Sequence, residues 1–396
     1  MRKVYIAGAC RTPIGKMGGA LSGLSAAKLG AIVIKEALSR SGISKDSVDH
    51  VYMGCVIQAG LGQNVARQAS LMAGLSYGTT AETLNIVCGS GLDAVNSAAY
   101  MIKCGAADIV IAGGMESMSN APFAVMKGRF GYRMGSPMRE SSLVDTMVRD
   151  ALWDATNDYH MGITAENVAY KWGLTREEVD AFAVSSQNKA CAAMKNGIFV
   201  DEIVPIMIKG KGKTEVISSD EGPREGTTME SLSKLKPVFK EDGIVTAGNS
   251  SGINDGAAAV VLVSDEKVKE LKLSPEAEWV SGCLGGVDPE FMGIGPVEST
   301  RKLLKTLKMT INDIDLIEAN EAFAAQSIVV RNELKIPDEK LNINGGAIAL
   351  GHPVGASGCR ILVTLLHNMK RQNKRIGLAT LCIGGGMGCS TLLYKC

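Results

Sequence analysis

The chain has 396 residues, more than one ordinary domain contains, so we expect two or three domains. Its 42 lysines and arginines nearly balance its 41 aspartates and glutamates, which argues against nucleic acid or an anionic membrane as the main partner. Hydrophobic residues make up 46% of the chain, enough for a large core, and no apolar run is as long as the roughly 18 residues of a membrane span.

Residues 1–7 lead at once into a predicted strand. They contain neither the apolar segment of a secretory signal nor the Arg/Ser-rich stretch of a transit peptide, and the last three residues are not a peroxisomal address. The ten cysteines show no CxxC pair and no short, regular spacing of a disulfide framework. We therefore expect a cytoplasmic protein with free thiols.

The chain repeats itself. An apolar helical pattern beginning at Leu29, followed by a predicted strand, is found again from Val297 onward, and further landmarks recur in the same order. Chance similarity of apolar patterns is the alternative, but several landmarks in one order favour a duplication. The matching segments are residues 29–51 and 297–317, 89–91 and 356–358, 109–115 and 378–387, and 258–263 and 391–394.

One copy of the repeat is interrupted after about Ser117, and its last strand is found at residues 258–263. We therefore expect a first half at residues 1–118 and 250–270, an inserted loop domain at residues 119–249, and a second half at residues 271–396. Each half alternates strands and helices, which predicts an α/β protein with mixed sheets covered by helices. Ligands of such sheets bind beyond the carboxyl ends of the strands.

Cys88 stands between a predicted strand, Thr83–Val87, and a predicted helix that begins after Gly89-Ser90-Gly91. A helix N-terminus offers free N–H groups and lowers the pKa of a nearby thiol. A small buried hydrophobe is the alternative, and that is our interpretation of six other cysteines, namely Cys10, Cys55, Cys104, Cys191, Cys283 and Cys359. For Cys88 we predict a nucleophile.

Three more reactive or polar side chains are predicted just beyond strand ends. Asn320 follows a strand at residues 314–318, His352 follows one at residues 341–344 through a glycine turn, and Cys382 ends one at residues 378–381. A histidine can take the proton of a cysteine, and the glycines after Cys382 can direct N–H groups at an oxyanion. A turn histidine and a core cysteine are the alternatives. The Cys and His spacings do not fit a zinc site.

Five stretches of the sequence resemble the signatures of the thiolase family. They are "NIVCGSGLDAV" with Cys88, "NEAFA" with Asn320, "NINGGAIALGHPVGASG" with His352, "CIGGGMG" with Cys382, and residues 247–252. The resemblance covers nearly the whole chain. It implies the thiolase fold, in which two duplicated αβαβα halves with layered mixed sheets carry an inserted loop domain.

The resemblance also implies a mechanism. Cys88 is acylated by an acyl-CoA with His352 as its base, and Cys382 then removes a methyl proton from a second acetyl-CoA. His352 and a water held by Asn320 stabilise the enolate, and the N–H groups of Cys88 and Gly384 stabilise the tetrahedral intermediate. Coenzyme A and acetyl-CoA are substrates, and neither a metal nor a tightly bound cofactor is required.

The resemblance assigns coenzyme A to the insertion and a short acyl pocket to its inner end. The residues that would bind coenzyme A are Leu152, His160, Arg224, Phe239, Ala247 and Ser251, and those that would wall the acyl pocket are Met161, Met292 and Phe323. A solvated surface position is the alternative for Arg224.

The stretch His160-Met161-Gly162 resembles the biosynthetic type, which condenses two acetyl-CoA molecules reversibly to acetoacetyl-CoA and CoA. The alternatives are a 3-ketoacyl-CoA thiolase of β-oxidation with broader chain length and, less favoured, a non-catalytic acyl-CoA binding protein. A β-ketoacyl synthase would carry a histidine in place of Asn320 and lack Cys382. The resemblance further implies a homotetramer, a dimer of dimers, without nucleic-acid or membrane partners.

Overall fold

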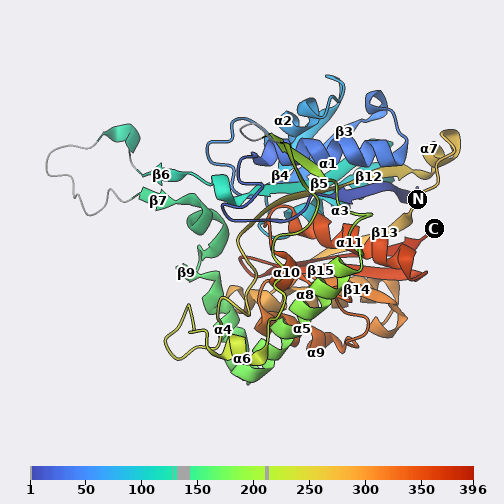
Figure 1. The fold of residues 1–396 in the computed structure, drawn as a ribbon. Coiled ribbons are helices and arrows are strands. Elements are labelled where there is room, and N and C mark those ends of the chain that lie inside the picture. The colour runs from blue at the N-terminus through green and yellow to red at the C-terminus, as the bar shows by residue number, and fades with distance from the viewer. Residues whose placement is uncertain (1, 127, 132–142, 210–213) are drawn as a thin grey trace.

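The computed structural model describes residues 2–126, 128–131, 143–209 and 214–396 (Figure 1). Within them, ten strands form a central mixed sheet: β1 (Val4–Arg11), β2 (Gly15–Lys16), β3 (His50–Gly54), β4 (Thr80–Leu84), β5 (Ile109–Ser117), β12 (Asn254–Ser264), β13 (Ala277–Gly286), β14 (Leu316–Ala319), β15 (Ile376–Ile383) and β16 (Met387–Lys395). The order is β14-β15-β16-β13-β1-β12-β5-β3-β4, and β2 pairs with β12. β3 is parallel to β4 and β5, and β14 is parallel to β15, whereas the strands between pair antiparallel. The predicted α/β class is confirmed.

The predicted repeat is present in the order of the elements. The first half runs β1-α1-β3-α2-β4-α3-β5 and ends with β12, and the second half runs β13-α8-β14-α9-α10-α11-β15-β16. The helices of the two halves are α1 (Ala26–Ser41), α2 (Val65–Met72), α3 (Ser90–Lys103), α7 (Asp265–Glu270), α8 (Gly295–Leu307), α9 (Ala324–Leu334), α10 (Ala347–Leu350) and α11 (Ser357–Arg371). The matching turns at residues 89–91 and 356–358 open α3 and α11, as the repeat predicts.

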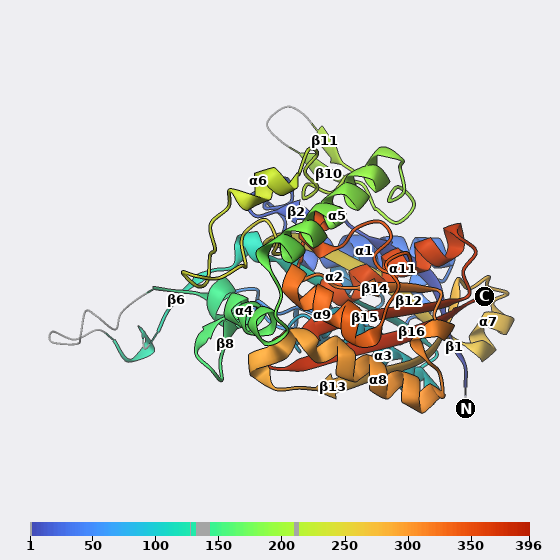
Figure 2. The same ribbon diagram turned by 90° about the horizontal axis from the view of Figure 1, so that it is seen from below.

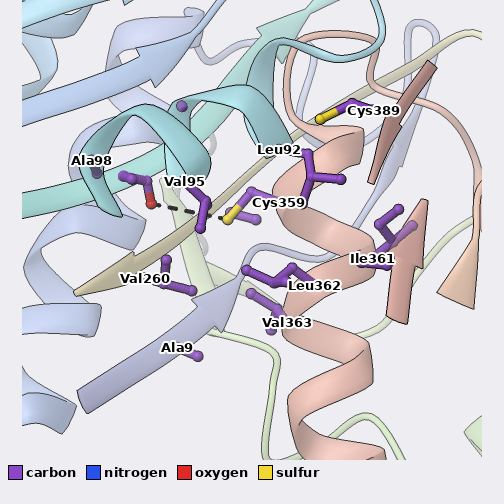
Figure 3. Packing of buried hydrophobic residues seen from close by; sticks show 14 of the residues in the cluster. Ala9, Leu92, Val95, Ala98, Val260, Cys359, Ile361, Leu362, Val363 and Cys389 are labelled. Atoms are coloured by element: carbon purple, nitrogen blue, oxygen red, sulfur yellow. Dashed lines mark hydrogen bonds between the residues drawn. The ribbon is translucent and has the colours of Figure 1, made fainter. Parts of the chain in front are cut away.

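Two helices, α3 and α11, form a buried middle layer of the molecule. They contact each other, α3 packs on strands of both halves, and α11 packs on β15 and β14 as well as on β12 and β5. Figure 3 shows this packing, with side chains of α3 such as Leu92 and Val95 facing Cys359 and Leu362 of α11. α11 is buried from Ser357 to Met369, and one buried stripe of it is polar, where Arg360, Thr364 and Asn368 donate to Asn320, Glu202 and Glu318.

The chain leaves the first half after β5 and returns to it at β12, which pairs with β5. The intervening elements are β6 (Phe123–Val125), β7 (Leu143–Asp145), β8 (Trp153–Asp154), β9 (Tyr159–His160), α4 (Met161–Lys171), α5 (Arg176–Lys195), β10 (Ile206–Lys209), β11 (Thr214–Ile217) and α6 (Met229–Ser233). α4 and α5 pack on α9 (Figure 2), and α5 also packs on α10. The insertion thus lies against the second half. The predicted domain boundaries stay predictions, and residues 127, 132–142 and 210–213 of the predicted insertion lie outside the described residues.

Short 3-10 or π turns complete the described chain at Lys45–Ser47, Met118–Asn120, Gly128–Phe130, Val148–Leu152, Pro289–Ile294 and Ile311–Asp313. No helix in the described part has the length and apolar character that crossing a membrane requires.

Two strands predicted next to the site differ in the structure. The strand predicted at residues 83–87 is β4, which ends at Leu84, because Val87 has the left-handed φ of 52° and turns the chain. The strand predicted at residues 341–344 is reduced to one parallel bridge between Leu341 and Ile317. Beyond this bridge, the Asn342 side chain accepts from the Ala319 N–H at 2.9 Å and donates to its carbonyl at 2.8 Å. That side chain takes the place of a backbone ladder beside β14.

Candidate active site

Cys88 lies in a tight turn that joins β4 to α3. Ser90, the first residue of α3, accepts the Ile86 N–H at 3.0 Å and donates to the Val87 carbonyl at 2.6 Å. Together with the left-handed backbone of Val87, which a β-branched residue adopts only at a cost, these bonds place Cys88 at the start of the helix. The predicted position at a helix N-terminus is therefore correct.

The predicted lowering of the Cys88 pKa is wrong. Burial raises the pKa of this thiol to about 11, against the opposing effect of the N–H groups of Gly384 and of Cys88 itself. Desolvation of a thiolate in a buried site outweighs two hydrogen bonds and a helix end. The N–H groups predicted to stabilise a tetrahedral oxyanion thus lie next to the Cys88 sulfur.

His352 follows α10 and Gly351, whose φ of 112° and close approach to Asn254 require glycine. The His352 N–H donates to Asn254 Oδ1 at 2.9 Å, and Asn254 Nδ2 donates to the Gly15 carbonyl at 2.9 Å. The histidine is therefore held by a strand of the first half, β12, although it belongs to the second. The sequence predicted His352 just beyond a strand end, whereas in the structure it follows the short helix α10.

The hydrogen bonds of His352 determine its tautomer. Nδ1 lies 2.5 Å from Ser357 Oγ, and Ser357 donates its own proton to the Pro353 carbonyl at 2.9 Å. Because the serine oxygen must accept at this contact, Nδ1 carries the proton and Nε2 is free. Nε2 is buried and has no hydrogen-bond partner among the described residues. Burial, and then the charge of Arg360, lowers the pKa of His352 to about 3, so the ring is a neutral base.

Asn320 lies just beyond β14, as predicted, and its N–H donates to the Thr380 carbonyl at 3.0 Å. Its Nδ2 lies 3.4 Å from His352 Nδ1, and its Oδ1 accepts from Arg360 Nη2 at 3.3 Å. The amide is thus held between the candidate base and a buried cation.

Cys382 is the penultimate residue of β15 and has no exposed surface. It packs in an apolar cluster with Met161, Met292 and Phe323, the residues predicted to wall the acyl pocket. Burial, and then the charge of the nearby Cys88, raises the pKa of Cys382 above its usual value. The two cysteines are therefore close neighbours.

A cavity of about 450 Å³ opens in front of these residues. Of the predicted site residues it is lined by Cys88, His352, Gly384, Leu152, His160, Arg224, Phe239, Ala247, Ser251, Met161, Met292 and Phe323. Asn320 and Cys382 do not line it but lie directly behind its wall, at His352 and at the methionines respectively.

Aromatic rings line one wall of this cavity. His160 stacks on Phe239 with 4.6 Å between ring centroids, and Phe239 meets Phe323 edge-to-face at 6.3 Å. Toward the surface, a second cavity of about 580 Å³ shares Arg224 and Ala247 with the first and is lined by polar groups such as Lys16 and Gln187. A long ligand with an apolar stem and a polar end fits this pair of cavities.

Several residues that support the site did not emerge from the sequence. Ser357 and Arg360 contact His352 and Asn320, and Asn254 holds the His352 backbone. Ser357 could have been found, because the repeat aligns it with Ser90, which has the same role of bonding a carbonyl at a helix start. Arg360 and Asn254 carry no such signal.

Glu116, a fourth such residue, ties the two halves together at the site. Its buried carboxylate accepts the Gly355 N–H at 2.9 Å and the N–H groups of Val56 and Ile57 at 3.0 and 3.2 Å. Burial raises the pKa of Glu116 to about 7 against these three donors. Because Gly355 lies between His352 and Ser357, the contact positions the base relative to Cys88.

Comparison with known proteins covers the whole chain. The family model "Thiolase, N-terminal domain" matches residues 4–266, and "Thiolase, C-terminal domain" matches residues 273–395. Proteins named "Acetyl-CoA acetyltransferase" from Syntrophomonas wolfei and Pseudomonas aeruginosa are each 55% identical, over 99% and 100% of both chains. A "Probable acetyl-CoA acyltransferase" from Staphylococcus aureus is 51% identical over 100% of both. The crystal structure of the Bacillus anthracis acetyl-CoA acetyltransferase is similar with a TM-score of 0.97 and 43% identity, over 100% of this chain and 99% of that one.

Proposed function

This chain belongs to the thiolase family of acyltransferases, and we propose that it catalyses the reversible condensation of two acetyl-CoA molecules to acetoacetyl-CoA and CoA. The observation that carries the proposal is the cavity that joins Cys88, an unpartnered His352 Nε2 and the Gly384 N–H. The full-length similarity to proteins named for this activity supports it. The β-oxidation alternative is not favoured by those names.

In the first half-reaction, His352 Nε2 accepts the Cys88 proton while the sulfur attacks the thioester carbonyl of acetyl-CoA. The N–H groups of Cys88 and Gly384 stabilise the oxyanion of the tetrahedral intermediate. When the intermediate collapses, the CoA sulfur leaves and takes the proton from His352. Because one thioester is exchanged for another, the acyl-enzyme keeps the acyl group activated.

In the second half-reaction, the Cys382 thiol gives its proton to His352 Nε2, and the resulting thiolate removes a methyl proton from a second acetyl-CoA. A buried thiolate with a raised pKa is a stronger base than an exposed one, as a weak carbon acid requires. The enolate attacks the acetyl group on Cys88 with its oxygen stabilised by His352 and by a water on Asn320. Cys88 leaves as a thiolate and recovers a proton from His352 Nε2, while Cys382 keeps the methyl proton, so both thiols and the neutral imidazole are restored.

Coenzyme A would occupy the paired cavities. Its apolar stem would pass Leu152, Phe239 and the backbone at residues 247–251, and its nucleotide would lie near Arg224. Met161, Met292 and Phe323 would close the acyl end, where their apolar packing leaves room for a short chain. The homotetramer implied by the family resemblance and the cytoplasmic location expected from the sequence are part of this proposal, and light scattering tests the first.

The substrate is tested by thiolysis of acetoacetyl-CoA and of an eight-carbon 3-ketoacyl-CoA. We expect kcat/KM to fall by at least about 100-fold for the longer chain, because each added methylene in a closed pocket is worth a factor of about 10 or more. Comparable rates on both substrates would refute the short-chain assignment. The Cys88→Ser variant serves as the inactive control, and Cys10→Ser as the active one, because Cys10 is buried away from the cavity.

A further inference from the structure

Arg360 is a buried cation that makes one hydrogen bond within the described part of the chain. It lies on α11 with 2% of its surface exposed, and its Nη2 donates to Asn320 Oδ1 at 3.3 Å. Its Nε and Nη1 have no hydrogen-bond partner among the described residues. Burying a guanidinium with most of its donors unpaired is costly, so the group calls for an explanation other than stability.

Arg360 is not part of a structural ion pair. The carboxylates of Glu318, Glu202 and Glu321 attract it through space, but no salt bridge to it exists in the described part of the chain. Arg11, equally buried, shows the contrast, because its guanidinium lies 2.6 Å from Glu202. Each of the three carboxylates is bound to another group instead.

Each of the three acids accepts a hydrogen bond from another group. Glu318 accepts from Asn368 through Oε1 at 3.2 Å, and its buried Oε2 has no hydrogen-bond partner among the described residues. Glu202 accepts from Arg11 and from Thr364, and Glu321 accepts from Ser186 and Asn342. The direct polar interaction that remains to Arg360 is the one with the Asn320 amide.

A guanidinium only donates hydrogen bonds, so it determines which end of the Asn320 amide faces it. Oδ1 must face Arg360, and Nδ2 then faces His352. Because His352 Nδ1 already gives its proton to Ser357, Nδ2 has no acceptor there, and its N–H groups are free to hold a water. Without the cation, the amide could rotate by a half turn at little steric cost.

We propose that Arg360 is a positioning residue for the condensation step, because it holds the Asn320 amide with Nδ2 toward the enolate side of the cavity. This inference rests on the proposed function. Acyl transfer to Cys88 uses His352 and the N–H groups of Cys88 and Gly384, and does not involve Asn320. Arg360 therefore acts on one of the two half-reactions.

The test separates the two half-reactions in Arg360→Met and Arg360→Lys. Acyl transfer is followed by exchange of labelled CoA into acetyl-CoA, and enolate formation by exchange of the acetyl methyl protons with deuterium. In Arg360→Met we expect methyl exchange and condensation to fall by about 10- to 100-fold, less than the roughly 100- to 1,000-fold for loss of an oxyanion donor, because the Asn320 amide stays and only its orientation is lost. Acyl exchange should stay within about threefold. Arg360→Lys, which keeps the charge but not the reach, should fall between wild type and Arg360→Met.

Arg11→Lys is the matched control, because it disturbs an equally buried arginine whose side chain bonds Glu202 and Asp220 and makes no hydrogen bond to Asn320. It should change both half-reactions by the same factor. Asn320→Ala completes a double-mutant cycle. If Arg360 acts through Asn320, the double variant Arg360→Met/Asn320→Ala should condense acetyl-CoA at no less than about half the rate of Asn320→Ala alone.

Equal losses in both half-reactions, or full additivity with Asn320→Ala, would overturn the inference while leaving the proposed function intact. Absence of CoA exchange and condensation in the wild type would refute the proposed function and this inference with it. Should Arg360→Met not fold because the nearby carboxylates repel, Arg360→Met combined with Glu318→Gln removes one of them and takes its place in the same comparison.

Discussion

The proton between Cys88 and His352 stays on sulfur in the free enzyme, because burial raises the thiol pKa to about 11 and lowers the imidazole pKa to about 3. Many cysteine enzymes hold a ready thiolate, whereas this site holds two neutral groups. The thiol is deprotonated when the thioester arrives and the oxyanion donors come into use. Ser357 contributes by fixing the tautomer that leaves Nε2 free.

The first prediction concerns the reactivity of Cys88 with iodoacetamide. Since the thiolate reacts and the folded-state pKa is about 11, the alkylation rate should rise about tenfold per pH unit between pH 7 and pH 9.5. Mass spectrometry of the Cys88 peptide measures the rate, and Cys88→Ser identifies background labelling. A rate that is already high at pH 7 and flat above it would indicate a preformed thiolate.

The second prediction assigns roles to the two cysteines. Cys88→Ser should lower both acyl exchange and condensation by at least about 1,000-fold, because the covalent intermediate is lost. Cys382→Ser should lower condensation by at least about 100-fold and leave acyl exchange within about threefold, because it removes the base alone. Condensation at the wild-type rate in Cys382→Ser would show that another group takes the methyl proton.

Among the elements, the turn before α11 is packed against three elements of the first half. A Cβ added at Gly54 of β3 would lie 2.7 Å from the Gly355 carbonyl oxygen. One added at Gly91 of α3 would lie 2.9 Å from it, and one at Gly114 of β5 would lie 2.0 Å from it. The Gly355 N–H is held by Glu116. These contacts bring the strand ends and helix starts of the two halves together, and with them Cys88 and His352.

The third prediction follows from this packing. Gly114→Ala would place a Cβ 2.0 Å from the Gly355 oxygen, and backbone cannot move aside as a flexible side chain can. We expect a loss of about 3 kcal/mol in unfolding free energy and a fall in kcat, measured by urea denaturation and by thiolysis. Gly23→Ala is the control, since no atom lies within 4 Å of its Cβ, and it should be near neutral. Equal stability of the two variants would contradict the close packing.

At the scale of the whole molecule, Arg11 attaches the insertion to the sheet. Its guanidinium lies 2.6 Å from Glu202 and 2.7 Å from Asp220, both on the insertion, and its backbone bonds Glu202 and Val204. The insertion supplies one side of the cavity proposed for coenzyme A. Arg11 is therefore one of the buried contacts that hold the insertion against the first half, together with the Ile14 N–H that donates to Asp220.

The fourth prediction tests this attachment. Arg11→Met leaves two buried carboxylates without their partner and should cost about 3–5 kcal/mol of stability. It should also raise KM for acetoacetyl-CoA more than it lowers kcat, because the cavity wall loosens. Arg301→Met, which removes a partly exposed pair with Glu333 at 3.0 Å, is the control and should cost at most about 1 kcal/mol. Similar stability of both variants would argue against the attachment.

The sequence by itself determined the α/β class and the duplicated order of elements, whereas the domain boundaries and the roles of the site residues stay predictions. Apolar periodicity and glycine turns are local, so they survive in the linear order of residues, and the turns at 89–91 and 356–358 matched in the structure as they did in the sequence. Two strands beside the site were misjudged, because Val87 and Asn342 adopt left-handed backbone that side-chain hydrogen bonds support.

Only the tertiary structure decided the protonation of the site and its supporting residues. The pKa of Cys88 depends on how completely both halves exclude water, and a helix start alone indicates the opposite direction. Arg360, Asn254 and Glu116 are far from their partners in the chain, so no local pattern reveals that each bonds a group at the site. Desolvation and long-range contacts exist only once the two halves have packed together.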